Sequence, residues 1–208
     1  MLARALRGIA FGASIAIVAM AGPTLHPVEI PVAIATAQPG RDGPVVEHVP
    51  FPTPTPPPVI LAAPTRLQIP SLALDTAVEA LGVDSTGAMD TPRNLWDVGW
   101  FQPGPSPGER GDAVIDGHVG LPGYPLIFST LARISTGADL IVVHADGTRS
   151  HFTVTGISSW PADSHPAGLF ATDGPARLTL ITCTGSYDGN NQTYANRLLV
   201  DATYAGSG

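Results

Sequence analysis

The residues of this chain that are best suited to chemistry are a cysteine and an arginine near its C-terminus. Cys183 is the single cysteine and ends the apolar run Leu178–Cys183, and Arg197 begins the next apolar run. If the two runs form an antiparallel hairpin, this spacing brings the thiol and the guanidinium to one rim. A solitary cysteine in an exported chain is either a buried, inert side chain or a reactive nucleophile, and its count alone does not decide between them.

A cysteine nucleophile needs a basic partner, because the attacking species is the thiolate and an ordinary thiol is mostly protonated at neutral pH. Among the six histidines, His118 ends the β-type run Ala113–His118, and a strand end readily displays a catalytic side chain. His144 and His151 flank the turn Asp146-Gly147, where we expect a solvent-exposed cross-strand pair. Because no third ligand stands at a metal-binding spacing, we expect no metal site.

The elements that position these residues are short β-type runs. From Pro64 onward, apolar runs alternate with glycine, proline and aspartate, and helix-length amphipathic periodicity is nearly absent. This pattern predicts an all-β fold, a closed or nearly closed barrel of about eight strands with one or two short helices, one of them at Leu126–Ala132. The expected strands are Arg66–Ile69, Thr76–Val83, Asp112–Gly117, Asp139–His144, Arg149–Ile157, Leu178–Cys183 and Arg197–Tyr204.

A polar segment, Thr184–Asn196, separates the last two expected strands. It is longer than a connection between neighbouring strands requires, which is usual for a loop that lines a site. We therefore expect a long loop that begins beside Cys183 and ends beside Arg197.

The N-terminal part has the composition of an export signal followed by a spacer. Arg4 and Arg7 precede an apolar stretch, so we expect residues 1–24 to be a cleaved signal peptide or an uncleaved membrane anchor. Residues 25–63 are rich in proline, which favours a semi-rigid extracellular stalk in the polyproline II conformation. Both alternatives place the domain of residues 64–206 outside the cytoplasm, either anchored at the extracellular face of the cell membrane or secreted.

The charge balance argues against one class of function. The formal net charge is -7, and the ten basic residues are arginines scattered along the chain. Nucleic-acid binding needs a clustered positive surface that displaces counterions from phosphates. We therefore expect no nucleic-acid partner.

Several of these residues resemble the signature of a known family. The run Leu178–Cys183 with the downstream Arg197, and the segment Asp116-Gly-His118, resemble the Thr-Leu-x-Thr-Cys, Arg and Gly-His motifs of sortases. The likeness extends over the domain from Pro64 onward and is greatest to class F sortases, with class E next. The segments that resemble those compact classes are Pro64–Pro70, Val98–Phe101, Gly104–Gly108 and Ala145–Thr148.

The resemblance implies a closed β-barrel and a cysteine transpeptidase without a cofactor. Such an enzyme cleaves a Leu-Pro-x-Thr-Gly-type sorting signal of a surface protein between Thr and Gly through a thioacyl-enzyme, and transfers the protein to a cell-wall amine. By this resemblance Cys183 is the nucleophile, His118 the general acid and base, and Arg197 the group that holds substrate and stabilises the oxyanion. We expect substrate contacts from four residues near them, Ile181, Thr182, Thr184 and Tyr194.

Two other functions fit the sequence. A cysteine endopeptidase or hydrolase on the same scaffold differs only in that water resolves the acyl-enzyme. In a non-catalytic wall-binding barrel, Cys183 is a buried apolar residue, Arg197 a structural ion-pair partner and Thr182 part of the core. Asp116 stands where the family commonly has a small apolar residue, and it either tunes His118 or lies on a solvated strand face.

Overall fold

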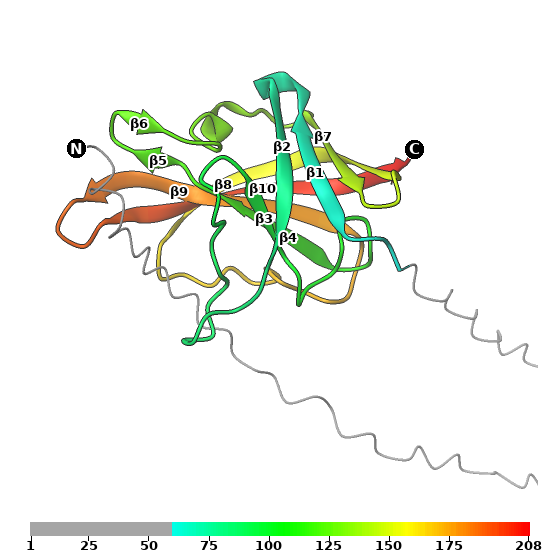
Figure 1. The fold of residues 1–208 in the computed structure, drawn as a ribbon, viewed down its shortest axis with the longest axis horizontal. Coiled ribbons are helices and arrows are strands. Elements are labelled where there is room, and N and C mark those ends of the chain that lie inside the picture. Colours follow the sequence, from blue (N-terminus) through cyan, green and yellow to red (C-terminus); the bar gives the residue numbers. More distant parts are fainter. Residues whose placement is uncertain (1–59) are drawn as a thin grey trace, which may run out of the picture. The chain divides into compact units, whose positions relative to one another are not determined.

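In the computed structural model, residues 60–208 form a closed β-barrel of eight strands, and the description below is confined to them. Around the barrel the strand order is β1-β2-β3-β4-β9-β10-β8-β7 (Figure 1). The barrel strands are β1 (Pro64–Ile69), β2 (Leu74–Leu81), β3 (Val98–Phe101), β4 (Asp112–Gly117), β7 (Asp139–His144), β8 (Arg149–Pro161), β9 (Arg177–Asp188) and β10 (Thr193–Ser207). Two short strands, β5 (Gly120–Leu121) and β6 (Tyr124–Pro125), form a separate hairpin.

The barrel closes because β1 pairs with β7 on one side and with β2 on the other. The pairs β2–β3 and β4–β9 are parallel, and the other neighbouring pairs are antiparallel. Parallel pairing of β4 with β9 matters for the site, because the C-terminal ends of these two strands then lie at the same end of the barrel.

Alternating apolar side chains fill the barrel interior. On β9, Leu178 and Leu180 are fully buried, and on β10 so is Val200. Because neighbouring side chains on a strand point to opposite faces, the residues between them lie on the outer face of the barrel. The interior cluster also contains Leu67, Ile69, Val98, Trp100, Ile115, Phe128, Leu131, Leu140, Val142, Phe152 and Val154.

A second apolar cluster lies on the outer face of β4, β9 and β10. Val114, Ile181 and Leu199, one from each strand, are buried there. Leu169 and Phe170, from the connection between β8 and β9, pack against this cluster, as do Leu81, Met89 and Phe101. This part of the sheet is therefore covered on both faces, and the connections that cover it shape a groove.

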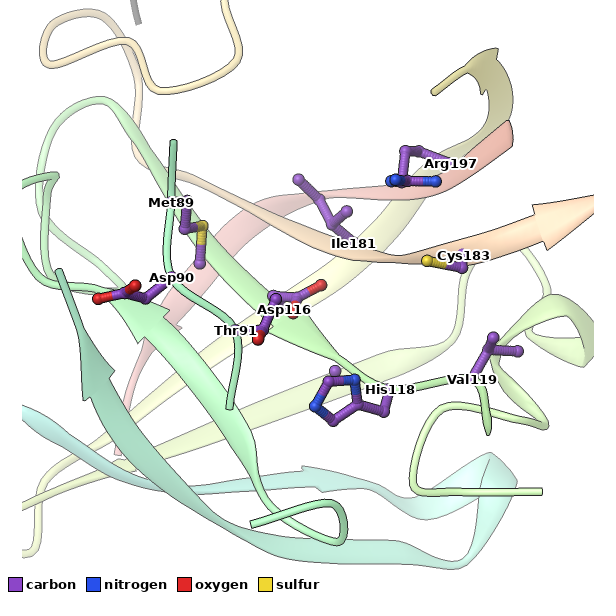
Figure 2. A pocket seen from close by; sticks show the side chains of 10 residues that line it. Met89, Asp90, Thr91, Asp116, His118, Val119, Ile181, Cys183 and Arg197 are labelled. Carbon is purple, nitrogen blue, oxygen red and sulfur yellow. The ribbon is translucent and has the colours of Figure 1, made fainter. Parts of the chain in front are cut away.

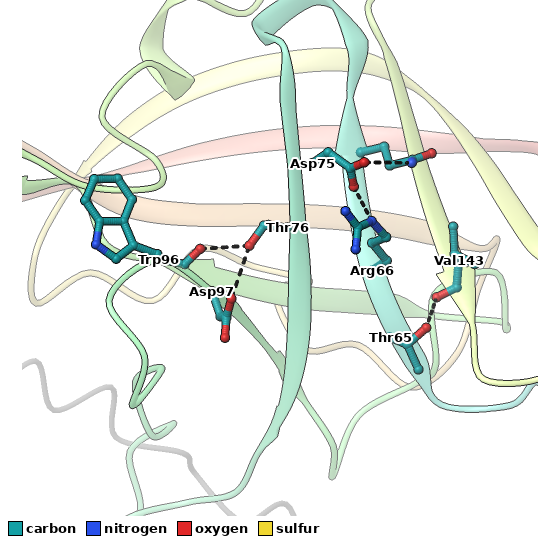
Figure 3. A network of polar contacts seen from close by, with 8 residues as sticks. Thr65, Arg66, Asp75, Thr76, Trp96, Asp97 and Val143 are labelled. Atoms are coloured by element: carbon teal, nitrogen blue, oxygen red, sulfur yellow. Dashed lines mark hydrogen bonds and ion pairs between the residues drawn. The ribbon is translucent and has the colours of Figure 1, made fainter.

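Polar contacts fix the connection between β2 and β3 to the barrel (Figure 3). The buried Thr76 donates its hydroxyl to the Trp96 carbonyl oxygen at 2.8 Å, and its Oγ1 lies 3.5 Å from a carboxylate oxygen of Asp97. At the other end of the connection, the Asp90 amide donates to the Gly82 carbonyl oxygen at 3.1 Å. Residues 82–97 thus form an ordered cover beside the end of β4.

The structure confirms the all-β barrel and its number of strands, and it differs from the expectation in several details. The four-residue strand β3 was not expected from the sequence, because Val98–Phe101 is short, contains glycine and is buried throughout, so it shows no alternation. The short helix expected at Leu126–Ala132 is present only as the single-turn 3-10 helix η3 (Leu131–Arg133), which follows successive turns. A second 3-10 helix, η2, spans Pro70–Leu72.

The long loop expected at Thr184–Asn196 is also wrong. Strand β9 continues to Asp188 and β10 begins at Thr193, so only residues 189–192 form the turn. The register shifts at Tyr194 and Asn196, and Tyr187 pairs with Tyr194, their ring centroids 5.1 Å apart. This ribbon is largely exposed and polar, and without a buried face it carries no apolar alternation that a sequence analysis can detect.

The expected pair of exposed histidines does not form. His144 is buried and His151 pairs with Ile141 on the opposite face of the β7–β8 hairpin. The His144 amide bonds to the Thr148 carbonyl oxygen, so the turn has one residue more than expected, and one extra residue reverses which face a side chain occupies. His144 Nδ1 lies 2.7 Å from the Ala62 carbonyl oxygen, and the Leu61 amide donates to Glu109 Oε1 at 2.8 Å.

The predictions for residues 1–24 and most of residues 25–63 lie outside the described residues. Within residues 60–208, no helix has the length and apolar character needed to cross a membrane. The expectation of a domain at residues 64–206 stays a prediction.

Candidate active site

Three adjacent strands bring the three expected catalytic residues together at one end of the barrel. Cys183 on β9 is the direct cross-strand partner of Arg197 on β10. On the other side of β9, Asp116 of β4 pairs in parallel with Ile181, and His118 follows directly after the end of β4. Because β9 lies between β4 and β10, the thiol stands between the imidazole and the guanidinium (Figure 2).

The backbone before His118 is locked by close packing. A Cβ atom on Gly117 would lie 2.4 Å from Phe128 Cδ2, so only glycine fits at this position. The Gly117 carbonyl oxygen accepts a hydrogen bond of 2.7 Å from the Thr182 hydroxyl, and the Phe128 amide donates to the His118 carbonyl oxygen at 2.9 Å. The position of His118 is therefore fixed by the core beneath it.

A small cavity of about 40 Å³ joins the three residues (Figure 2). Its wall includes His118, Cys183, Arg197, Asp116 and Ile181. The connection between β2 and β3 supplies the remaining side of the wall with Met89, Asp90 and Thr91. The sequence analysis missed these three residues, because a polar connection carries no pattern that shows which strand end it covers.

One hydrogen bond assigns the role of the His118 ring nitrogen Nε2. Nε2 lies 2.9 Å from the Pro92 carbonyl oxygen, and His118 is buried. Because a carbonyl oxygen only accepts, Nε2 carries the hydrogen of this bond. The Pro92 carbonyl thus holds the ring in one tautomer.

Arg197 is buried and is held by backbone carbonyl groups. Its Nη1 donates to the carbonyl oxygens of Tyr194 at 3.3 Å and of Asn196 at 3.2 Å. The ion pairs within residues 60–208 are Arg66–Asp75 and Arg177–Asp112, so Arg197 has no ion-pair partner among these residues. Its positive charge faces the cavity that contains Cys183.

The electrostatics of the cavity keep the thiol neutral at rest. Burial raises the pKa of Cys183, the charge of Arg197 acts in the opposite direction, and the carboxylate of Asp116 raises this pKa further. Burial also raises the pKa of Asp116, while His118 and Arg197 act to lower it. Asp116 therefore lies among the charges of this cavity and not on the solvated face that was the second expectation, and an effect of Asp116 on His118 stays a prediction.

The four expected substrate residues fall into two places. Ile181 lines the cavity shared by His118 and Arg197. Thr182, Thr184 and Tyr194 line a separate cavity of about 220 Å³ on the other side of Cys183. Cys183 contributes to the walls of both cavities. Within the described part of the chain, no group of three or more His, Cys, Asp or Glu residues could hold a metal ion.

An eight-stranded closed barrel with cysteine, histidine and arginine at the end of three adjacent strands defines a class of cysteine-dependent β-barrel enzymes. The family model described as the sortase domain matches residues 67–205 of this chain. The chain therefore belongs to the sortase family, whose members are cysteine enzymes of the transpeptidase type that act on surface proteins bearing sorting signals.

Solved structures of sortases are similar to this chain. Sortase C1 of Streptococcus agalactiae, in complex with MTSET, is 26% identical, with a TM-score of 0.54 and coverage of 68% of each chain. Sortase C1 of Streptococcus suis is 22% identical, with a TM-score of 0.53 and coverage of 70% of this chain and 74% of that one. Sortase C of Streptococcus pneumoniae is 23% identical, with a TM-score of 0.52 and coverage of 68% and 67%. No curated protein matches the chain.

Proposed function

We propose that this chain is a class F-type sortase at the extracellular face of the cell membrane, anchored by its N-terminal segment. It cleaves a Leu-Pro-x-Thr-Gly-type signal between Thr and Gly and joins the surface protein to an amine of the cell wall. The observation that carries the proposal is the meeting of Cys183, His118 and Arg197 in one cavity. The class assignment rests on the motif segments in the sequence, such as Val98–Phe101.

The reaction begins from a neutral thiol. When the peptide binds, the Cys183 proton moves to His118, and the sulfur attacks the carbonyl carbon of the substrate threonine. Negative charge develops on the carbonyl oxygen, and the guanidinium of Arg197, held by two backbone carbonyl groups, stabilises this charge. The planar fork of arginine suits this role because it can donate to two oxygens at once.

The intermediate then collapses to a thioacyl-enzyme. The bond between the threonine carbonyl carbon and the glycine nitrogen breaks, its electron pair stays on the nitrogen, and His118 gives that nitrogen a proton. An incoming amine attacks the thioester, the thiolate of Cys183 leaves, and the amine loses its proton through His118. If water arrives in place of the amine, the product is a free acid, which is the hydrolase alternative.

Mass spectrometry of the full-length protein tests the proposal. After exposure to a Leu-Pro-Ala-Thr-Gly-Gly peptide, we expect an adduct that ends in threonine on Cys183, and none on a Cys183→Ala variant. Addition of triglycine should convert the adduct to an amide product, whereas a hydrolase gives the free acid alone. Absence of an adduct from folded wild-type protein would contradict the proposed activity and favour the non-catalytic barrel.

A further inference from the structure

A larger cavity lies on the outer face of the barrel, apart from the catalytic cavity. It has a volume of about 260 Å³. Its walls include Asp112 of β4, Thr179 of β9 and Asp201 of β10, with Trp160 and Arg177 beside them. Thr179 is paired with Asp201 across the β9–β10 hairpin, so these two residues lie opposite one another on neighbouring strands.

This cavity continues the catalytic groove along β9. A narrow apolar cavity between the two is lined by Ile181 and Arg197, which also line the catalytic cavity. The same narrow cavity shares Leu169, Leu199 and Trp160 with the larger one. The outward residues of β9 therefore lead from Cys183 past an apolar stretch to a charged chamber.

The chamber has too few hydrogen-bond donors for its carboxylates. The Thr179 hydroxyl lies within 3.2 Å of three carboxylate oxygens, two of Asp112 and one of Asp201, but it carries only one hydrogen. Arg177 approaches Asp112 only to 3.6 Å, and its side chain is 44% exposed. Asp112 is 3% exposed, so the part of its carboxylate that can be reached faces this cavity. A buried carboxylate without enough donors favours a cationic ligand.

The spacing fits the residues that precede the sorting signal. An extended peptide advances about 3.3 Å per residue, so the chamber beside Thr179 is about 13 Å along β9 from Cys183. With the substrate threonine at Cys183, the signal leucine lies three residues, about 10 Å, earlier, between the level of Ile181 and Leu199 and the level of Thr179. The one or two residues before that leucine then reach the chamber, whose apolar walls suit the methylene groups of a long basic side chain.

We propose that the chamber formed by Asp112, Thr179, Asp201, Arg177 and Trp160 binds a lysine or arginine side chain one or two residues before the leucine of the sorting signal. This inference rests on the proposed function for the direction of the peptide. The wall of the chamber carries two carboxylates and one guanidinium, so its charge is complementary to that of a basic side chain. The indole of Trp160 on its wall adds an aromatic surface that attracts a cation.

Peptide binding to the full-length Cys183→Ala variant, which cannot acylate, tests the chamber directly. Two Leu-Pro-Ala-Thr-Gly-Gly peptides carry lysine one or two residues before the leucine, and matched peptides carry norleucine, which has the same stem without the charge. We expect the better lysine peptide to bind on the order of tenfold tighter than its norleucine match, the effect of a charge-assisted hydrogen bond. Equal binding of lysine and norleucine peptides overturns the proposal.

A second substitution locates the effect. Adding Asp201→Asn should reduce the preference for lysine to within about twofold, whereas Asp188→Asn, the same charge change at the exposed end of the hairpin, should leave it intact. A preference that survives Asp201→Asn overturns the assignment. If the Asp201→Asn variant does not fold, the salt dependence of binding to the Cys183→Ala variant is the alternative test. A preference for lysine that does not change with salt concentration would then overturn the assignment.

The two proposals fail in different ways. Wild-type protein that forms no adduct with any of these peptides refutes the proposed activity, while a lysine preference in binding by the Cys183→Ala variant would still support the chamber. Adduct formation at equal rates with lysine and norleucine peptides, together with equal binding, supports the activity and refutes the chamber. No adduct with wild-type protein, together with no binding of any peptide by the Cys183→Ala variant, overturns both.

Discussion

The guanidinium of Arg197 has a fixed position in the site, because the residue is buried and is held by backbone carbonyl groups. We expect Arg197→Ala to lower the rate of Cys183 acylation about 10²- to 10³-fold, as loss of an oxyanion donor does. Arg197→Lys restores charge without the planar fork, so its rate should lie between the two. Rapid-quench mass spectrometry of the adduct measures both rates. Wild-type rates in Arg197→Ala would remove Arg197 from the mechanism.

Asp116 acts on the thiol through its charge. Because the carboxylate raises the pKa of Cys183, Asp116→Asn should lower that pKa and shift the pH profile of iodoacetamide alkylation toward lower pH. The comparison is made in a His118→Ala background, so that a change in the imidazole does not contribute. Asp188→Asn, at the exposed hairpin end, is the matched control and should leave the profile unchanged. A shift toward higher pH would contradict this role.

The proposed catalytic residues were predictable where they follow the two-residue period of a strand or lie at the end of a strand. The spacing of Cys183 and Arg197 predicted their contact, and the register confirms it. Sequence alone did not place Asp116, because a two-residue period shows that Asp116 and His118 share a face but not that this face is covered. The contact of Pro92 with His118 could not be predicted from the sequence, because Pro92 contributes only its backbone carbonyl group, from the connection between β2 and β3.

Among the elements, the end of β4 depends on Gly117, which has no side chain. Gly117→Ala would place a methyl group against Phe128, and we expect it to lower the free energy of unfolding by about 1–3 kcal/mol and to slow acylation by displacing His118. Gly189→Ala, where the added methyl meets nothing within 4 Å, is the control. Urea unfolding measures the stability difference. Equal stability of the two variants would mean that Phe128 relaxes without cost.

The elements that the sequence did not reveal share one property, the absence of an apolar and polar alternation. Strand β3 is buried at all four positions, and the β9–β10 ribbon beyond Cys183 is polar and largely exposed. Both strands are instead fixed by their partners, β3 by β2 and β4, and the ribbon by continuous pairing from the barrel. The local pattern of apolar and polar residues therefore predicted the barrel but not all of its strands.

For the whole molecule, the buried carboxylate of Asp112 makes stability depend on pH. Burial raises the pKa of Asp112 to about 6, above its value in the unfolded chain. The folded state then disfavours the charged form, so the cost is fully present above about pH 6 and is relieved as the pH falls toward 4. Asp112→Asn should stabilise the protein more at pH 7.5 than at pH 4.5, by on the order of 2 kcal/mol.

Urea unfolding of wild type and Asp112→Asn at the two pH values measures this difference. The comparison isolates Asp112, because the other titrating groups are common to both proteins. An advantage of Asn that is the same at pH 7.5 and pH 4.5 would show that the carboxylate is solvated in the folded state.

The point at which the chain enters the barrel has a mechanical consequence. Leu61 and Ala62 are tied to Glu109 and His144, which lie on other parts of the chain, before β1 begins at Pro64. A force applied at Leu61 and Ala62 is thus shared by several segments before it reaches β1. Unfolding that starts at this point must therefore break contacts with two distant parts of the chain before β1 can separate from β2 and β7.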